Sequence, residues 1–347
     1  MADHKAKDAV GTVIIASDDW LATQPHEDII DPGLPIVDAH HHLWNRGGHR
    51  YLLDELLADT GSGHNVVATV FVDCVAYYRE HGPTEMKPLG ETEFANGVAA
   101  MAASGSHGPT RACAAIVSHA DLLRGAAARE VLQAHVHAGN GRFRGIRHAG
   151  GWDASAMIRN SHTQPPPGLY DLPAFREGFA QLAPLGLSFE AWQYHPQLPM
   201  VTDLARAFEG TSIVLNHVGG PLGAGPYAGQ ADATFVAWKR HLLELARCPN
   251  VTVKLGGLGM PIGLFDLHRR AVPASSQQIA DAWRPWVETC IDAFGAPRCM
   301  FESNFPVDKA ATGYAVLWNA FKRLAAGASV AERGDLFSGT ATRIYRL

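Results

Sequence analysis

The feature that most restricts the fold is a repeated alternation between short β-rich segments and longer segments with helical periodicity. Eight short segments are rich in apolar and β-branched residues, and most are followed by apolar residues at helical spacing. Several are apolar throughout, as in parallel strands that are buried on both faces. Eight such units favour a (β/α)₈ TIM barrel, with an open doubly wound sheet as the alternative. The expected strands are 34–42, 65–74, 111–119, 142–148, 187–194, 211–217, 250–255 and 298–304.

The segments between these strands predict the outer layer of helices. Residues 1–33 are expected to form an N-terminal arm, and residues 34–347 the barrel domain. Two Pro/Gly-rich stretches, 160–171 and 219–230, are expected to be long loops at the active-site end, as lids, substrate walls or inert surface. The expected helices are 51–59, which has the weakest pattern, 93–103, 121–137, 172–182, 201–208, 235–246, 277–294 and 314–325.

Composition restricts the class of partner. A chain of 347 residues with 47% hydrophobic residues can bury a large core, and its net charge of −5, without a Lys/Arg cluster, argues against a nucleic-acid surface. A small-molecule substrate is expected instead, and a homo-oligomer is left open.

The five cysteines are scattered and form no C-x-x-C pair, which indicates a reduced protein. The sequence has no signal-peptide pattern and no apolar run of roughly 20 residues. We therefore expect a cytoplasmic protein without a membrane partner.

Three consecutive histidines end the first expected strand, in the stretch "LPIVDAHHHLW" at 34–44. Because alternate residues of a strand share a face, His40 and His42 are expected to point together while His41 points away. Two neutral imidazoles at that spacing can bind one divalent ion or hold a carbonyl oxygen. A polar strand end without function is the alternative, but barrel active sites are built at this end of the strands.

The other expected strands also end in polar residues. Without partners, each such group would cost roughly 1–3 kcal/mol if buried, so packing alone does not explain the pattern. His217 is the best third member of a site, because it follows an apolar strand and precedes a Gly-Gly turn that lets a substrate approach closely. For any single member, a satisfied core residue is the alternative. The candidates are His119, Arg147, His148, Glu190, Trp192, His195, His217, Lys254, Glu302 and Asn304.

Five motifs follow one another from residue 31 onward: "DPGLPIVDAHHHLW", "FRGIRH", "IVLNHVGGP", "NVTVKLGGL" and "RCMFESNFPVD". Together they resemble the lactonase-type branch of the amidohydrolase superfamily, which includes sugar-acid lactonases and 2-pyrone-4,6-dicarboxylate lactonase. The resemblance implies a (β/α)₈ barrel that hydrolyses a lactone or a related carboxylic ester. It places the family's H-x-H on His40 and His42, its strand-six histidine on His217 and its strand-four arginine on Arg147.

The chain departs from the family at the last strand. The family usually reads G-S-D-W-P there, with the aspartate as general base and metal ligand, whereas this sequence reads "ESNFP", so that Asn304 takes the aspartate's place. An amide cannot accept a proton from water and is a poor metal ligand. Glu302, on the same face and one layer deeper, is the preferred replacement as catalytic base, and Asp308 is the alternative. An ion pair between Glu302 and Lys254 is the non-catalytic reading.

The expected reaction is attack of water on a lactone carbonyl. The carbonyl is polarised either by one divalent ion, expected to be zinc and held by His40, His42 and His217, or by these imidazoles directly with no metal. A substrate carboxylate is expected to pair with arginine or lysine, and aromatic residues are expected to form a wall. Core packing or helix capping is the alternative for each. The substrate-binding candidates are Glu91, Arg147, His148, Glu190, Trp192, His195, Lys254 and Tyr77.

Three other functions are compatible with the same residues. A metal-dependent decarboxylase or hydratase would use the same scaffold. An amide or imide hydrolase would need a strong metal site, because the leaving nitrogen needs more help than an ester oxygen. A non-catalytic small-molecule-binding barrel would follow if Asn304 reflects the loss of the base.

Overall fold

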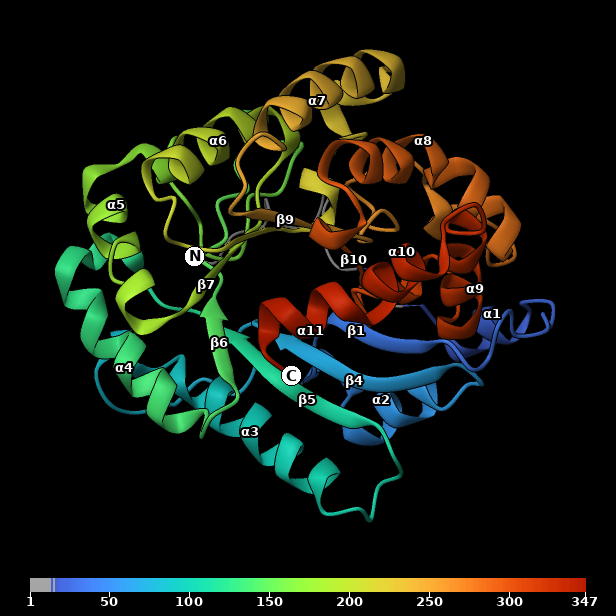
Figure 1. Ribbon diagram of the computed structural model, residues 1–347, viewed down its shortest axis with the longest axis horizontal. Coiled ribbons are helices and arrows are strands. Elements are labelled where there is room, and N and C mark those ends of the chain that lie inside the picture. Colours follow the sequence, from blue (N-terminus) through green and yellow to red (C-terminus); the bar gives the residue numbers. More distant parts are fainter. Residues whose placement is uncertain (1–13, 15) are drawn as a thin grey trace.

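A closed ring of eight parallel strands forms the centre of the computed structural model, which describes residue 14 and residues 16–347 (Figure 1). The strands neighbour one another in chain order, and the last meets the first. His42 N donates to Phe305 O at 2.7 Å, and Asn304 N donates to His40 O at 2.9 Å. The predicted (β/α)₈ TIM barrel is therefore confirmed, and the open sheet is excluded. The strands are β1 (Pro35–His41), β4 (Asn65–Val72), β5 (Arg111–Ser118), β6 (Phe143–Ile146), β7 (Ser188–Ala191), β8 (Ile213–Leu215), β9 (Val251–Leu255) and β10 (Cys299–Phe301).

A ring of helices surrounds the strands (Figure 1). Each corresponds to a predicted segment, with differences at the ends. One start has a visible cause: Ser275 accepts a hydrogen bond from Gln278 N, and the Gln278 side chain returns one to Ser275 N, which caps α8. The helices are α2 (Leu53–Thr60), α3 (Leu89–Ala103), α4 (Ala128–Ala138), α5 (Pro173–Phe179), α6 (Leu198–Ala207), α7 (Ala231–Leu245), α8 (Ser276–Phe294) and α9 (Tyr314–Leu324).

The amino-terminal end of the barrel is closed by the end of the chain. In Figure 1, α11 (Thr340–Tyr345) crosses in front of the strands, preceded by α10 (Val330–Gly334). Ala341 and Tyr345 of α11 pack in one buried cluster with inward residues such as Val70. Because apolar side chains fill this end of the described barrel, the opposite end is the one through which a ligand can enter.

The segment before β1 packs against α9 and the residues that precede it. The helix α1 (Asp18–Ala22) precedes β1, and a hairpin of β2 (Trp44–Arg46) and β3 (His49–Tyr51) follows it. Gln24 Nε2 donates to Thr312 Oγ1 at 2.6 Å, and Ile30 N donates to Asn319 Oδ1 at 2.9 Å. Residues 1–13 and 15 of the predicted arm 1–33 lie outside the described residues.

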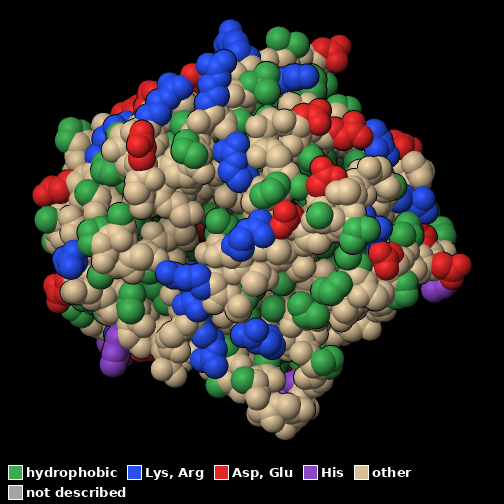
Figure 2. Space-filling model, viewed as in Figure 1, with side chains coloured by type: hydrophobic (Ala, Val, Ile, Leu, Met, Phe, Trp, Pro, Cys, Tyr) green, Lys and Arg blue, Asp and Glu red, His purple; other side chains and the backbone are tan. Residues whose placement is uncertain are grey.

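The surface is mixed in character. Figure 2 shows side chains of both charge signs spread among apolar and uncharged ones on the face that carries α11. Within the described residues, no helix has both the length and the apolar character needed to cross a bilayer.

Candidate active site

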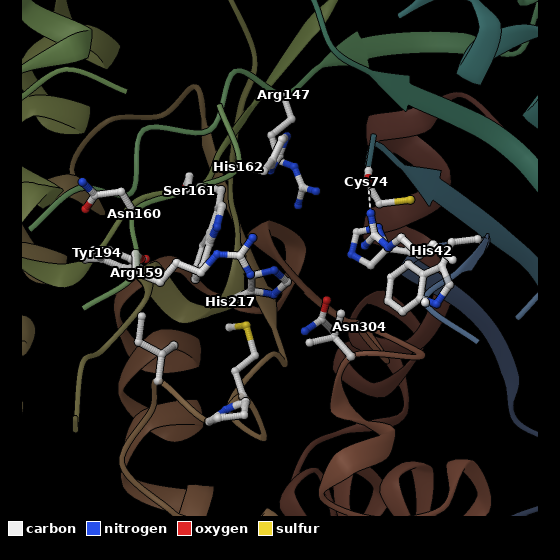
Figure 3. A pocket seen from close by; sticks show the side chains of 18 of the residues that line it. His42, Cys74, Arg147, Arg159, Asn160, Ser161, His162, Tyr194, His217 and Asn304 are labelled. Carbon is white, nitrogen blue, oxygen red and sulfur yellow. Dashed lines mark hydrogen bonds between the residues drawn. The ribbon is translucent and has the colours of Figure 1, made fainter. Parts of the chain in front are cut away.

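A cavity of about 480 Å³ lies where the barrel strands end, lined by strand ends and the loops that follow them (Figure 3). Its lining includes His42, His217 and Asn304 from the predicted site. No aspartate or glutamate among the described residues lines it, whereas Arg147 and Arg159 do. The cavity is therefore cationic, which suits an electron-rich or anionic ligand.

The histidines of β1 and of the segment after β8 meet below this cavity. His40 Nε2 lies 3.2 Å from His42 Nε2, and the rings of His40 and His217 are 4.7 Å apart. His42 Nδ1 lies 2.8 Å from Val72 O, a pure acceptor, so Nδ1 carries the proton and Nε2 a lone pair. Burial, reinforced by nearby cations, holds the pKa of each of the three histidines well below 6.5. They are neutral donors of lone pairs.

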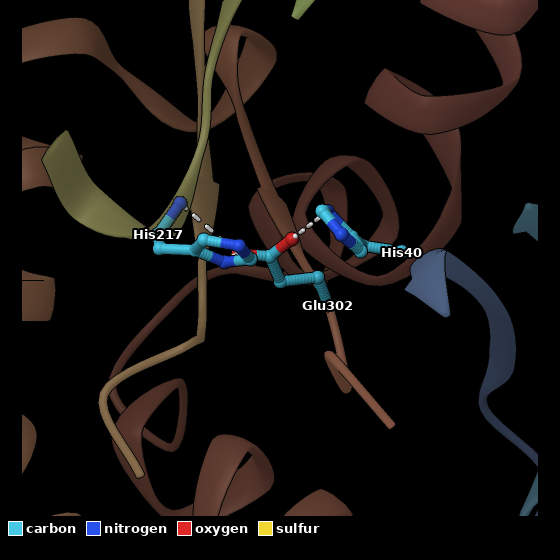
Figure 4. Close-up of side chains that lie close together, drawn as sticks. All are labelled: His40, His217 and Glu302. Atoms are coloured by element: carbon cyan, nitrogen blue, oxygen red, sulfur yellow. Dashed lines mark hydrogen bonds and ion pairs between the residues drawn. The ribbon is translucent and has the colours of Figure 1, made fainter. Parts of the chain in front are cut away.

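The Glu302 carboxylate joins two of these histidines (Figure 4). Its Oε1 lies 2.7 Å from His217 Nδ1 and accepts a hydrogen bond from His217 N at 3.2 Å. Its Oε2 lies 2.9 Å from His40 Nδ1 but off the line of the ring N–H, so this buried oxygen has no hydrogen-bond partner among the described residues. Burial raises the pKa of Glu302 to about 8. The carboxylate does not line the cavity, so the prediction that it takes a proton directly from water needs correction. Glu302 contacts the imidazoles of His40 and His217 and holds them in position.

Asn304 lines the cavity, whereas Asp308, the alternative base, does not. Asp308 Oδ1 accepts a hydrogen bond from Asn304 Nδ2 at 2.9 Å, and its Oδ2 accepts one from Gly259 N at 3.1 Å. Burial raises the pKa of Asp308 to about 7. Asp308 therefore holds Asn304 and a loop in place rather than facing substrate. Both Asn304 and His217 have positive φ angles, of 54° and 52°, a strained conformation that concentrates at functional sites.

Arg147 is fixed by an aspartate that the sequence analysis did not select. Arg147 Nε donates to Asp73 Oδ1 at 2.6 Å, and a second guanidinium nitrogen donates to Asp73 O. Burial alone would raise the pKa of Asp73, but Arg147 and His162 hold this pKa below its usual range. Arg147 also directs a nitrogen at His40 Nε2, 3.4 Å away. Of the predicted substrate cations, Arg147 is the one that lines the cavity.

Lys254 and Glu190 were predicted to bind substrate, and the structure contradicts this. Both are fully buried below the histidines, and Lys254 Nζ pairs with Glu190 Oε2 at 2.8 Å. Tyr345 donates to the other oxygen of Glu190 at 2.5 Å. Lys254 also lies 3.3 Å from His40 Nδ1. The lysine's ion-pair partner is thus Glu190 rather than Glu302, and the pair supports the floor of the site.

Glu91 is likewise a support rather than a ligand group. It is fully buried, and its Oε1 accepts hydrogen bonds from Cys74 N at 2.9 Å and Ala76 N at 2.8 Å. It therefore shapes the segment after β4 that carries Asp73.

Three further predicted binding residues lie outside the cavity. His148 Nδ1 accepts from Leu122 N at 3.2 Å, and His195 Nδ1 accepts from Leu222 N at 3.2 Å. Tyr77 is 43% exposed, and its ring packs against that of Phe94. Polar strand ends predicted the correct end of the barrel, but they did not separate loop-holding histidines from ligand-facing ones.

Trp192, predicted as part of an aromatic wall, does line the cavity, with its ring 4.7 Å from that of His217. Arg159 and His162, which come from the long loop after β6, were not among the predicted site residues. In Figure 3, Arg159 extends toward His217, across the cavity from His42. The Pro/Gly-rich composition of this stretch was a signal for a wall, but it did not identify the residues.

The donors at the floor of the site fit a divalent cation. His40, His217 and Glu302 each offer one ligand atom, and these atoms lie within 4.8 Å of one another. The unpartnered Glu302 Oε2 and the neutral imidazoles are the chemistry that zinc prefers. Of the predicted ligands His40, His42 and His217, this group contains His40 and His217, with Glu302 as its third member.

A family model described as amidohydrolase matches residues 37–347. The chain belongs to the amidohydrolase family. The predicted family, and with it the predicted class of hydrolytic enzyme, is confirmed.

Several relatives of this amidohydrolase match nearly its whole length. An uncharacterized protein, y4mH, of Sinorhizobium fredii (strain NBRC 101917 / NGR234) is 32% identical over 90% of this chain and 99% of its own. An L-fucono-1,5-lactonase of Burkholderia multivorans (strain ATCC 17616 / 249) is 27% identical over 90% of this chain and 96% of its own. A crystal structure of an amidohydrolase from Burkholderia multivorans with bound zinc has a TM-score of 0.68 and 26% identity, covering 90% of this chain and 99% of that one.

Proposed function

We propose that this amidohydrolase opens a lactone by hydrolysis. The observation that carries the proposal is the junction of the Glu302 carboxylate with two neutral histidines, His40 and His217, at the floor of a cationic cavity. The L-fucono-1,5-lactonase relative, aligned over 90% of the chain, supports a cyclic ester as substrate. A ring ester needs less activation than an amide, which agrees with a site that lacks the family's aspartate at Asn304.

His40, His217 and Glu302 would hold one divalent cation, and zinc suits this mixture of nitrogen and oxygen donors. When bound, such an ion polarises a carbonyl and lowers the pKa of water. Glu302 would then supply the carboxylate ligand that Asn304 cannot. The crystal structure of a relative with zinc supports this choice of metal.

Arg147 stabilises the developing oxyanion in this proposal. Its guanidinium is held at Asp73 and faces His40, so it is oriented before substrate arrives. A fixed cationic donor in a site of low water content stabilises a transition-state charge more than the same group in water. Trp192, beside His217, forms a flat wall against the lactone ring.

The substrate is proposed to carry a carboxylate, and Arg159 is its partner. Arg147 is already neutralised by Asp73, and Lys254 by Glu190. Within the described part of the chain, Arg159 forms no ion pair, and it lines the cavity. Its backbone is held by Tyr194, whose hydroxyl donates to Arg159 O. Arg159 can therefore pair with an external anion without losing an internal partner.

The test combines elemental analysis with a panel of lactones. Protein purified without chelator is expected to contain about one zinc per chain and to open small lactones. His217→Asn and Glu302→Gln are each expected to lower kcat/KM by roughly 100-fold or more, because each breaks the junction that orients the site. His195→Asn is the matched control, since this histidine lies outside the cavity. Failure of the wild type to open any lactone would refute the proposal.

A further inference from the structure

We propose that His162 is the proton donor for the leaving oxygen of the lactone, with Asp73 as its positioning partner. This inference rests on the proposed function and assigns a catalytic role to a residue on the loop after β6. The evidence is the position of His162 in the cavity wall and its pairing with the buried carboxylate of Asp73.

The two oxygens of Asp73 are divided between Arg147 and His162. Oδ1 accepts from Arg147 Nε at 2.6 Å, and Oδ2 lies 3.1 Å from His162 Nε2. Neither His162 Nε2 nor Asp73 Oδ2 has an aligned hydrogen-bond partner among the described residues, so their close approach is the contact that links the imidazole to the carboxylate. Asp73 is fully buried, whereas the His162 side chain is 27% exposed. A buried carboxylate thus lies against a partly exposed histidine at the cavity surface, where it can orient the imidazole.

The loop that carries His162 is anchored on both sides of the residue. Ser161 N donates to Gly151 O at 2.8 Å, and Thr163 Oγ1 donates to Ala149 O at 2.5 Å. The loop backbone is thereby tied to the segment that directly follows Arg147 and β6. His162 is held in the wall by its neighbours, as a group that transfers protons must be.

Asn304, His42 and His217, which also line the cavity, do not suit this step. No described aspartate or glutamate lines the cavity, and Asn304 has no transferable proton. His42 and His217 are committed through Nδ1 to Val72 O and to Glu302. His162 Nδ1 has no hydrogen-bond partner among the described residues, so it is the atom that can face the substrate.

The step conserves atoms and charge. Water adds to the carbonyl carbon, the carbonyl π electrons move to oxygen, and the added water releases one of its protons to solvent. The tetrahedral intermediate then collapses, and the bond between the carbonyl carbon and the ring oxygen breaks. The ring oxygen takes the electron pair of that bond and a proton from His162 Nδ1, which leaves a neutral imidazole. The product is the open hydroxy acid, and solvent returns a proton to His162.

The experiment compares two lactones that differ in their leaving oxygen. δ-Valerolactone releases an aliphatic alkoxide and needs a proton donor, whereas dihydrocoumarin releases a phenoxide and needs little help. His162→Gln is expected to lower kcat for δ-valerolactone by roughly 100-fold or more, the usual contribution of general acid catalysis, and to leave kcat for dihydrocoumarin nearly unchanged. His137→Gln is the matched control, because His137 is exposed on α4 and lies outside the cavity.

Rescue provides a second readout. With His162→Ala, added imidazole is expected to restore turnover of δ-valerolactone and to leave dihydrocoumarin unaffected. Equal losses for both lactones, or no loss for either, would overturn the assignment, since a structural role does not depend on the leaving group. A wild-type enzyme inert toward both lactones would instead overturn the proposed function, and this inference with it.

Discussion

Replacing Glu91 separates a supporting role from a role in substrate binding. The carboxylate is fully buried and accepts two backbone N–H groups, those of Cys74 and Ala76. Glu91→Ala leaves both donors without a partner, at roughly 1–3 kcal/mol each. We therefore expect a loss of about 2–6 kcal/mol in the free energy of unfolding. Glu91→Gln keeps one acceptor oxygen at the same place and should cost far less.

The pH dependence gives the size of a second effect. Burial, together with the negative charge of Asp73, raises the pKa of Glu91 from 4.5 to about 8. Because the folded pKa is raised, the folded protein binds the proton more tightly, and stability falls as pH rises from 4.5 to 8. A difference of about 3.5 units at roughly 1.4 kcal/mol per unit sets an upper limit of about 5 kcal/mol.

The assay is urea unfolding of the wild type, Glu91→Gln and Glu91→Ala between pH 5 and pH 8. The wild type is expected to lose stability across this range relative to Glu91→Gln, which has no charge to bury. Lactone turnover by Glu91→Gln at pH 7 should stay close to that of the wild type, because Glu91 does not line the cavity. Equal pH slopes for the two proteins, or loss of turnover with an intact fold, would refute this reasoning.

Three further substitutions test the geometry of the site. Gly257→Ala should lower lactone turnover by roughly tenfold or more, because a Cβ at this left-handed position (φ 68°) would lie 2.3 Å from His217 Nδ1. Gly327→Ala is the control: its Cβ would meet nothing within 4 Å, so turnover should not change. Arg159→Met should raise KM for carboxylated lactones by roughly tenfold, as expected for the loss of one exposed ion pair with the substrate carboxylate. KM for uncharged lactones should not change, and equal changes in KM for both kinds of lactone would contradict this role of Arg159. Asn304→Asp should lower the melting temperature more at pH 8 than at pH 5. The Asn304 amide now donates a hydrogen bond to Asp308 at 2.9 Å, and the substitution replaces this bond by repulsion between two carboxylates. A change in melting temperature that does not depend on pH would exclude this repulsion.

The sequence predicted the barrel because its signals are local. Continuous apolar runs identify strands buried on both faces, and each of the eight predicted runs contains one strand. Helix ends were less well predicted, because they depend on neighbours. The helix α3 begins at Leu89, where Gly90 packs so closely on the backbone of Tyr77 that a Cβ would lie 2.3 Å from its carbonyl oxygen. The spacing of apolar residues along a helix carries no information about such a close approach to another part of the chain.

The site was predicted only in part, for a different reason. Strand alternation and the polar strand ends pointed to His42 and His217 correctly as cavity residues. Asp73 was hidden inside a predicted strand, and its importance appears only when Arg147, 74 residues later, reaches it. His162 is positioned by loop contacts that composition does not encode. Pairings across the barrel mouth therefore had to come from the structure.

The central claim is most directly tested by measuring zinc content and lactone turnover on the same preparations of wild type and Glu302→Gln. The proposal predicts about one zinc per wild-type chain, loss of both metal and turnover in the variant, and recovery of wild-type turnover when zinc is restored after chelation. A Glu302→Gln protein that keeps its metal and opens lactones at the wild-type rate would contradict the claim that His40, His217 and Glu302 form the reactive centre.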